Sequence, residues 1–389
     1  MTSPAPLVVG FDRDMTLVDP RAADEALAAV RRHGGKALVA GKSTRNAALL
    51  SEDGASVYVG DHVSDVEGAL AAGVLSVSVL TGGCSEEALR GAGTQVVLSS
   101  LTDFPDWLDS RLLDLRLAAL AQDLRARRSV MVAFSGGADS AFLLAAAVRA
   151  LGSDNVVAAT AYSDSLPQHE RDPAHEFASG LGVRVLTPKT REMDRKGYRA
   201  NAGDRCYFCK AELLDVLGPL ATELGFEHVA TGTNADDALA GFRPGIRAAS
   251  ERGAITPLRD AGFTKHQIRA ASRMWGLATW HKAAAACLSS RVAFGIEVSP
   301  FRLSRIERAE VAVRSALDGA GLDVRNLRVR DLGEHASIEV DAELVASART
   351  LPQVVAAARE AGFQHAEIDP SGFRSGSMNE RLSEPDRYR

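Results

Sequence analysis

Apolar runs of strand length alternate with helical stretches rich in Ala, Leu and Arg along almost the whole chain. The strand candidates near the N-terminus are LVVGFD, ALVA, SVYVGD, LSVSVL and TQVVLS. Residues 109–129 then carry apolar positions at helical spacing, and VMVAFSGG (130–137) begins a second series of strands. Alternation of this kind is typical of parallel sheets covered by helices, so it predicts an α/β fold.

The chain has 389 residues, which is more than one hydrophobic core usually serves. We expect a first domain over residues 1–108, a linker helix over 109–128 and a second α/β domain over 129–292. After residue 292 the pattern changes to LRVRDLG, ASIEV and HAEIDP with helices between. This change predicts a smaller C-terminal α/β domain over residues 293–389, which would bind substrate or join subunits.

Composition and charge narrow the class of protein. Hydrophobic residues make up 46% and charged residues 24%, as in ordinary globular proteins, and the net charge is −5. An acidic total disfavours bulk binding to nucleic acid or to an anionic membrane. The sequence has no long apolar run typical of a membrane helix, and its first residues lack the basic start of a signal peptide. Four cysteines do not make a secreted disulfide framework, so we expect a cytoplasmic protein with reduced thiols.

Carboxylates follow two of the predicted N-terminal strands. VVGFDRD presents Asp12 and Asp14, and VYVGDHVSD presents Asp61 and Asp65. Strand-end carboxylates can hold Mg²⁺ through hard oxygen ligands. They can also provide a nucleophile, Asp12, and a general acid or base, Asp14, for phosphoryl transfer.

Residues 7–107 resemble the haloacid-dehalogenase (HAD) superfamily of phosphatases. The resemblance implies that Asp12 is the phosphorylated aspartate, that Asp14 is the proton donor and that Asp61 and Asp65 are magnesium ligands. The superfamily also uses a Ser or Thr at the end of a second strand, where this chain has Ala40, and a Lys. The nearby candidates for these roles are Lys42, Ser43 and Thr44. The stretch before Asp61 is also too short for a cap domain. We therefore favour a shortened, inactive scaffold over a working phosphatase.

The segment VMVAFSGGADSAFLL predicts a strand, a Gly-rich turn and a helix. Such a turn lets backbone N–H groups and a helix N-terminus surround an anion. It lacks the Lys of a Walker loop and resembles the SGGxDS pyrophosphate loop of enzymes that split ATP into AMP and pyrophosphate. The residues that we expect at the ATP site are Ser135, Gly136, Gly137, Asp139, Ser140 and, after the next strand, Ser163.

Three cysteines point to sulfur chemistry at this ATP site. DRCYFCK contains Cys206 and Cys209, and Cys287 follows in TWHKAAAACLSSR, whereas Cys84 stands apart. A disulfide, a metal site and a reactive thiol are all compatible with the close pair. We expect Arg205 and Lys210 to help keep the thiols ionised.

Residues 112–380 closely resemble the LarE family of ATP-dependent sulfur transferases, which assemble a nickel-pincer nucleotide cofactor. The matching stretches are SGGADS, RCYFCK, ATGTNADD, FRPGIRAASERGAITPL, TWHK with ACLSSR, RVRDLG and IDPSGFRSGSMN. The resemblance implies a Rossmann-like ATP-binding unit of the adenine-nucleotide α-hydrolase type with a smaller C-terminal domain. It also implies ATP and Mg²⁺ as requirements, a sulfide or other sulfur donor, and a homo-oligomer.

The family has two forms that differ at the cysteines. One form gives up the sulfur of a cysteine at the position of Cys287 and leaves dehydroalanine. The other has three cysteines that resemble ligands of a 4Fe–4S cluster, and this chain has all three, Cys206, Cys209 and Cys287. Three thiolates leave one iron open for an extra sulfide. We favour the cluster over the sacrificial thiol, and over zinc with His281 or His169 as a further ligand.

Arginines are frequent in the stretches that carry this resemblance, and guanidinium groups suit phosphate and carboxylate. Asp331, Ser337, His281 and Ala283 depart from the residues usual in the family, which suggests an altered substrate. Asp236 and Asp237 are candidates for magnesium, and Glu339 and Asp369 for orienting the substrate. The residues that we expect to bind substrate or phosphate are Arg291, Arg328, Arg330 and Arg374.

The sequence therefore predicts an ATP-dependent sulfur transferase that adenylates a carboxylate of a small, nucleotide-like substrate and replaces oxygen with sulfur. A tRNA thiolase with the same loop and a cluster is the enzymatic alternative. The acidic total and the absence of an added RNA-binding domain disfavour it. A non-catalytic module that binds a nucleotide or a cluster is the other alternative.

Overall fold

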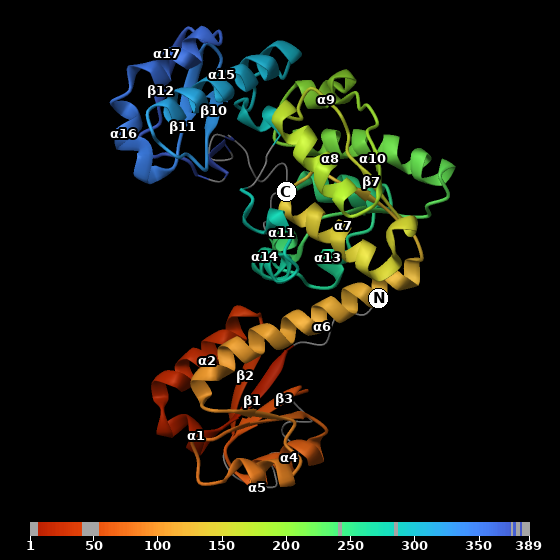
Figure 1. Cartoon of the computed structure of the whole chain (residues 1–389), viewed down its shortest axis with the longest axis vertical. Coiled ribbons are helices and arrows are strands. Elements are labelled where there is room, and N and C mark those ends of the chain that lie inside the picture. The colour runs from red at the N-terminus through yellow and green to blue at the C-terminus, as the bar shows by residue number, and fades with distance from the viewer. Residues whose placement is uncertain are drawn as a thin grey trace. The chain divides into compact units, whose positions relative to one another are not determined.

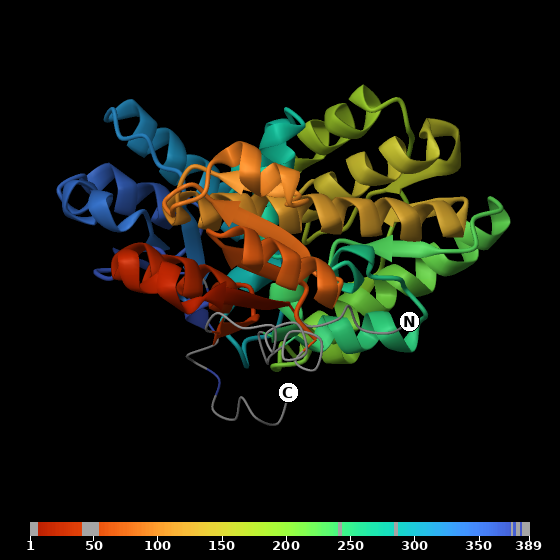
Figure 2. The ribbon, with the colours of Figure 1, turned by 90° about the horizontal axis from the view of Figure 1, so that it is seen from below.

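The computed structural model describes residues 7–40, 54–239, 243–283, 287–374, 376–378 and 382. The chain divides into two compact units, Met1–Arg116 and Leu117–Arg389, here called unit 1 and unit 2 (Figures 1 and 2). No helix within the described residues combines the length and apolar character needed to cross a bilayer. The candidate positions Lys42, Ser43 and Thr44 lie outside the described residues.

Unit 1 is built on a five-stranded sheet in the order β2-β1-β3-β4-β5, and every pairing in it is parallel. The central strands are buried on both faces because helices cover the sheet, which explains their continuous apolar runs. Phe11 and Phe104 meet edge to face in the core, with ring centroids 5.2 Å apart. The strands are β1 (Val8–Asp12), β2 (Lys36–Ala40), β3 (Val57–Gly60), β4 (Leu75–Val79) and β5 (Val96–Leu98). The helices are α1 (Arg13–Val18), α2 (Pro20–Arg32), α4 (Val63–Ala72), α5 (Glu86–Gly91), η1 (Leu101–Asp103) and α6 (Phe104–Arg127), which extends past the unit boundary.

Unit 2 begins with a four-stranded parallel sheet in the order β8-β7-β6-β9. The chain runs outward from β6 to β8 and then returns to place β9 on the other side of β6. Open sheets bind ligands at the carboxyl ends of the strands where the order reverses in this way. The strands are β6 (Val130–Ala133), β7 (Val156–Ala159), β8 (Arg184–Leu186) and β9 (Val229–Thr231).

Helices and short 3₁₀ turns connect these strands, and several of them carry site residues. The long ones are α7, which follows β6, and α10, which begins at the cysteine pair. The helices are α7 (Ala138–Leu151), α8 (Arg171–Gly180), α9 (Lys196–Arg199), α10 (Arg205–Glu223), α11 (Ala235–Leu239), α12 (Pro244–Glu251), α13 (Pro257–Asp260) and α14 (Lys265–Met274). The 3₁₀ turns are η2 (Ser153–Asn155), η3 (Gln168–Glu170), η4 (Glu192–Asp194), η5 (Ala278–His281) and η6 (Leu288–Arg291).

The C-terminal part of unit 2 has a small mixed sheet in the order β10-β11-β12. Its core continues into the part of unit 2 that holds the four-stranded sheet, because Tyr198 and Leu288 belong to the same apolar cluster as Val313 and Ile338. The prediction of an α/β fold with parallel, Rossmann-like sheets and a small C-terminal α/β part is therefore confirmed. The elements are α15 (Pro300–Gly319), β10 (Arg328–Asp331), β11 (His335–Glu339), η7 (Ala342–Leu344), α16 (Val345–Arg349), α17 (Pro352–Glu360) and β12 (His365–Ile368).

Candidate functional site

A Gly-rich turn joins β6 to α7 in unit 2. Gly136 has a φ of +71°, in the left-handed region that residues with side chains rarely adopt. A Cβ on Gly136 would lie 2.9 Å from Cβ of Ala174, so the close approach of α8 also requires glycine there. Gly137 is the N-cap of α7 and has no side chain to accept the first N–H groups of that helix. The turn therefore presents a helix N-terminus to a ligand, the arrangement that binds phosphate.

Side chains from the first turn of α7 form hydrogen bonds across the Gly-rich turn and add a carboxylate to it. Ser140 Oγ donates to the carbonyl of Gly137 at 3.1 Å and accepts from the N–H of Ser135 at 3.3 Å. Asp139 accepts a hydrogen bond from the ammonium of Lys265, which comes from the start of α14. Burial raises the pKa of the Asp139 carboxyl in spite of that ammonium. A carboxylate at this position needs a cation beside it, which Lys265 or a bound metal ion can provide.

Two cavities meet at the turn. The first, here called the nucleotide cavity, has a volume of about 320 Å³ and contains Ser135, Gly137, Asp139 and Ser140. The second, here called the sulfur cavity, has a volume of about 240 Å³ and contains Ser163, Cys209 and Cys287. The residues that line both are Ser135, Ala161, Leu166 and Leu213. Five of the six expected ATP-site residues thus line one or both of these two connected cavities.

The cysteines come together from two segments that are distant in sequence. Cys206 and Cys209 lie three residues apart at the start of α10, so they share a face of the helix. Cys287 directly precedes η6, where the N–H of Leu288 donates to the carbonyl of Ser165 at 2.8 Å. Cys206 is exposed and the other two thiols are half-buried. Cys84 belongs to unit 1 and is not part of this group.

Burial controls the charge of the thiols. It raises the pKa of the Cys206 thiol and of the Cys209 thiol, and the nearby Cys287 raises both pKa values further. Arg205 lowers the pKa of Cys206, and Lys210 lowers that of Cys209, in the direction expected from the sequence. Desolvation outweighs both cations, so they help to ionise the thiols in the expected direction but do not suffice alone. A bound metal cation would favour the thiolate forms further.

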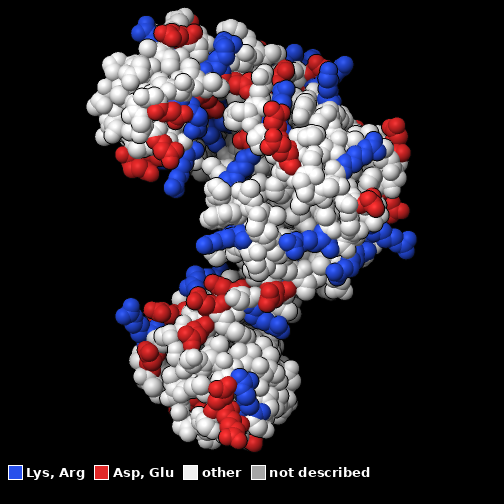
Figure 3. Space-filling view, viewed as in Figure 1, with Lys and Arg blue, Asp and Glu red and all other residues white. Residues whose placement is uncertain are grey.

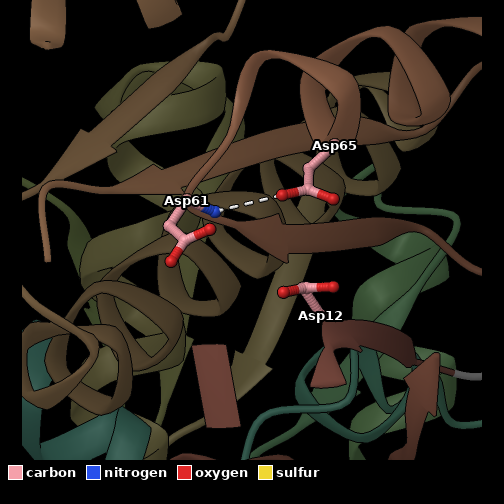
Figure 4. Close-up of side chains that lie close together, drawn as sticks. All are labelled: Asp12, Asp61 and Asp65. Carbon is pink, nitrogen blue, oxygen red and sulfur yellow. Dashed lines mark hydrogen bonds between the residues drawn. The ribbon is translucent and has the colours of Figure 1, made fainter. Parts of the chain in front are cut away.

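Unit 1 carries a separate group of carboxylates. Oxygens of Asp12, Asp61 and Asp65 lie within 4.8 Å of one another, as Figure 4 shows. They meet because β1 and β3 are neighbouring parallel strands, and Asp12 ends one while Asp61 follows the other. Oδ1 of Asp12 is buried and has no hydrogen-bond partner among the described residues. Burial, followed by the charge of Asp12, raises the pKa of Asp65 to about 6.

These oxygens fit a divalent cation, because they are hard donors and closely spaced, and Oδ1 of Asp12 is buried without a hydrogen-bond partner among the described residues. The backbone N–H of Asp61 donates to Oδ2 of Asp65 at 3.3 Å, which orients that carboxylate. Asp14 is exposed on α1 and does not contribute a side-chain oxygen to the group. β2 ends at Ala40, which pairs with Asp12 across the sheet, at the position where the HAD resemblance implies a Ser or Thr.

Comparisons with known proteins agree with the two-part organisation. A HAD-hydrolase-like family model matches residues 26–104, and this match begins after Asp12. An uncharacterised protein of Synechocystis is 37% identical over 275 residues, covering 70% of this chain and all of that protein. The pyridinium-3,5-bisthiocarboxylic acid mononucleotide synthase of Lactiplantibacillus plantarum is 32% identical over 271 residues, covering 68% of this chain and 94% of that enzyme. The chain belongs to the LarE family.

A single zinc ion, the alternative to an iron–sulfur cluster, would need a fourth ligand beside the three thiols. His169 is exposed beside Glu170, and His281 lines a different hollow, so neither histidine lines the sulfur cavity.

The four arginines assigned to substrate binding have different surroundings. Arg291 is buried, pairs with Glu310 at 2.9 Å and donates to the carbonyl of Cys287 at 2.9 Å. It therefore ties the sulfur cavity to α15. Arg330 is buried and pairs with Glu339 at 2.6 Å. Glu339, which we expected to orient the substrate, is therefore the ion-pair partner of an arginine. Both guanidinium groups thus already have carboxylate partners within the protein.

Arg374 lines a small cavity of about 90 Å³ together with Arg330, Ser337 and Asp369. Burial, followed by the neighbouring Arg291, lowers the pKa of Arg328 to about 10, but Arg328 does not line this cavity. The lining combines the two guanidinium groups with the carboxylates of Glu339 and Asp369. The guanidinium groups make the small cavity a candidate phosphate or carboxylate site.

Two of the departures from the family pattern, Asp331 and Ser337, have different surroundings in the structure. Asp331 is fully buried and pairs with Arg302 at 2.8 Å and with Arg305 at 2.6 Å, both on α15. It does not line the small cavity, so its negative charge is neutralised inside the C-terminal part. Ser337 does line that cavity and donates to Asp369 at 3.4 Å. Of these two departures, Ser337 is the one placed to affect a ligand.

Sequence reasoning missed several polar residues that the fold brings to these cavities. Lys265 and Lys282 contact the Gly-rich turn, although neither belongs to its motif. Glu192 is buried in the sulfur cavity and accepts hydrogen bonds from Ser165 and Thr190, each at 2.9 Å. Lysines and glutamates in helical stretches look like surface residues in a sequence, so only the pairing of distant segments reveals them.

Proposed function

We propose that the protein is an ATP-dependent sulfur transferase that acts on a carboxylate of a small, nucleotide-like substrate. The observation that carries the proposal is the continuity of the nucleotide and sulfur cavities through Ser135, Ala161, Leu166 and Leu213. An adenylated carboxylate formed at the first cavity would not have to leave the protein to meet sulfur at the second. The related enzyme of L. plantarum is named for a pyridinium mononucleotide with two thiocarboxylic acid groups, which suggests the substrate class.

The first step is adenylation. A carboxylate oxygen of the substrate attacks the α-phosphorus of ATP, and the bond from that phosphorus to the bridging oxygen breaks. Pyrophosphate leaves with the electron pair, and an acyl-adenylate remains. The turn at Gly136 and the N-terminus of α7 would hold the phosphates, and Asp139 and Asp237 face the same cavity as candidate magnesium ligands.

The second step is sulfur transfer. A sulfur nucleophile attacks the acyl carbon, AMP leaves with the electron pair of its oxygen, and a thiocarboxylate remains. A 4Fe–4S cluster on Cys206, Cys209 and Cys287 would supply a replaceable sulfide at its open iron. Cys209 and Cys287 line the cavity beside Ser163 and Ser165, so the chain itself orients both the nucleophile and the acyl group.

The sacrificial route remains the second form of the same proposal. In that route the thiolate of Cys287 attacks the acyl carbon and AMP leaves, which forms a thioester. Loss of the α-proton of Cys287 then breaks its Cβ–S bond, so that the thiocarboxylate leaves with the electron pair and dehydroalanine remains. Each protein molecule would then act once. The route needs Cys287 alone, whereas Cys206 and Cys209 would have no chemical part in it.

The alternatives make different predictions about partners. A tRNA thiolase needs a broad basic surface, and on the face shown in Figure 3 acidic and basic side chains are interspersed over the described residues of both units. A non-catalytic module would bind ATP without forming pyrophosphate.

We also propose a cytoplasmic homo-oligomer, and a finer division of the chain at residues 108, 128 and 292, as expected from the sequence.

The test is mass spectrometry of small molecules after anaerobic incubation of the protein with ATP, Mg²⁺, sulfide and pyridinium carboxylate mononucleotides. We expect an oxygen-to-sulfur mass change together with AMP and pyrophosphate in equal amounts. ATP–pyrophosphate exchange that depends on the carboxylate would support the first step separately. Exchange without any carboxylate, or a mass change in tRNA and not in small molecules, would contradict the proposal.

A further inference from the structure

The Gly-rich turn has no lysine or arginine of its own, and two lysines reach it from the segment that follows β9. Lys265 contacts Asp139 on α7. Lys282 donates to the carbonyl of Gly136 at 3.0 Å and to Glu170 at 2.5 Å. Lys282 is therefore in contact with the backbone of the turn itself, at the residue whose φ is +71°.

The structure holds Lys282 in this position from its backbone as well. Arg269 on α14 donates to the carbonyl of Trp280 at 2.7 Å and to that of Lys282 at 2.8 Å. Glu170 lies at the end of η3, directly before α8, and its side chain is mostly buried. A lysine fixed at both ends in this way loses little further freedom when it binds a ligand.

The ammonium of Lys282 has a donor left for a ligand. A lysine ammonium has three N–H groups, and Gly136 and Glu170 accept two of them. Within the described part of the chain the third has no acceptor, and about a quarter of the side chain is still exposed. A phosphate oxygen on the turn could accept it without breaking either existing bond.

We propose that Lys282 binds the pyrophosphate portion of ATP and stabilises it as the leaving group, with Glu170 as its positioning residue. This inference rests on the proposed function, since it assigns a role in the adenylation step. When the bond from the α-phosphorus breaks, the bridging oxygen takes the electron pair and pyrophosphate gains negative charge. A fixed ammonium beside the turn offsets that charge, as the lysine within a Walker loop does for other nucleotides.

The test is calorimetric titration of the full chain with inorganic pyrophosphate and, separately, with AMP. Lys282→Ala removes one charge-assisted hydrogen bond, so we expect pyrophosphate affinity to fall about tenfold or more while AMP affinity is unchanged. Lys282→Arg keeps the charge and should recover part of the affinity. The matched control is Arg184→Ala, which removes an exposed positive charge at the start of β8, the end of the strand that faces away from the turn.

A second variant is expected to increase pyrophosphate affinity, which damage to the fold would not do. Glu170→Gln keeps an acceptor for the ammonium and removes a negative charge beside the turn, so pyrophosphate should bind more tightly. Unchanged binding would remove Glu170 from the proposal. Pyrophosphate affinity in Lys282→Ala equal to that of the unchanged protein would overturn the role of Lys282.

Failure of the proposed function has a different signature. If the unchanged protein binds neither ATP nor pyrophosphate, the adenylation step itself is wrong. The unchanged protein could instead bind both and support carboxylate-dependent exchange. If Lys282→Ala then shows the same exchange rate and the same dependence of that rate on pyrophosphate concentration, only the role of Lys282 is wrong. Retained AMP binding in each variant shows that the nucleotide cavity is still folded.

Discussion

The two units of this chain each end a buried parallel strand in a polar turn, and among the described residues the turn of unit 2 has the fuller set of partners. In unit 2 the turn after β6 is contacted by Lys265 and Lys282 from distant segments. In unit 1 Asp12 at the end of β1 meets Asp61 and Asp65, but the neighbouring strand β2 ends at Ala40. The comparison shows that a strand-end motif defines a site only when neighbouring strands and helices supply the complementary groups.

The difference in chemistry follows from this. The turn in unit 2 offers N–H groups, two lysines and an adjoining cavity with thiols, which suits an anionic nucleotide and a nucleophile. The carboxylates of unit 1 suit a cation, but beside them the described residues offer no hydroxyl at the end of β2 to bind a phosphoryl group. We therefore expect unit 1 to bind a metal ion and unit 2 to perform the reaction.

The largest effect should come from the turn of unit 2. Gly136→Ala places a Cβ 2.9 Å from Ala174 and forces an alanine to φ +71°, and Asp139→Ala leaves Lys265 without its partner. We expect carboxylate-dependent ATP–pyrophosphate exchange to fall by about a thousandfold or more in each, because phosphate positioning supplies much of this kind of catalysis. Circular dichroism should show a preserved fold. Exchange at the normal rate in both variants would remove the central claim about the turn.

The next effect should separate the two cavities of unit 2. Cys287→Ala should abolish thiocarboxylate formation while adenylation continues, because Cys287 lines the sulfur cavity and not the nucleotide cavity. After anaerobic purification, iron and sulfide content should collapse in Cys206→Ala, Cys209→Ala and Cys287→Ala. Cys84→Ala, in unit 1, is the matched control and should keep its iron.

The contrary result for the cysteines is equally specific. A protein that holds no iron, and in which Cys287 becomes dehydroalanine after one turnover, would establish the sacrificial form. The pair on α10 would then not be a cluster site. Peptide mass spectrometry across Cys287 distinguishes the two outcomes.

A smaller effect is expected from unit 1. The full chain should hydrolyse small phosphate esters more slowly than about 1 s⁻¹, because Ala40 replaces the hydroxyl residue and the stretch between Asp19 and Asp61 is too short for a cap domain. Asp12→Asn should leave sulfur transfer unchanged and should weaken Mg²⁺ binding measured by calorimetry. Phosphatase turnover above that rate, lost in Asp12→Asn, would show that unit 1 is an active enzyme and would break the comparison.

The smallest effect concerns pH and the stability of unit 1. Burial, followed by the charge of Asp12, raises the pKa of Asp65 from its ordinary value of 3.8 to about 6. The folded state therefore holds this proton more tightly than the unfolded state does. Unit 1 should lose stability as pH rises from about 4 to about 6, by at most about 3 kcal/mol.

Thermal unfolding in the presence of EDTA, followed by calorimetry over this pH range, measures the change. Asp65→Asn removes the titrating group and should flatten the dependence of the first unfolding transition. A transition whose midpoint rises through this range in the unchanged protein would contradict the sign. Unit 2 provides an internal reference in the same scan.

Local sequence determined the elements that carry the site. Strand, Gly-rich turn and helix follow from apolar runs and glycines at Ser135–Ser140, because backbone torsions and helix N-termini depend on neighbouring residues. The two cysteines three positions apart were certain to share a helix face once α10 formed. Asp12 and Asp61 could be paired in advance because strand ends in a parallel sheet share one edge.

Only the tertiary structure decided which distant groups join them. It brought Lys282 to Gly136 and buried Glu192 beside Cys209, and it directed Asp331 to the arginines of α15 and not to a ligand. These outcomes depend on how helices pack across the sheet, which local patterns do not encode. The sequence by itself therefore determined the family, the turn and the thiols. Packing decided the charge around them, because electrostatic partners act through space and not along the chain.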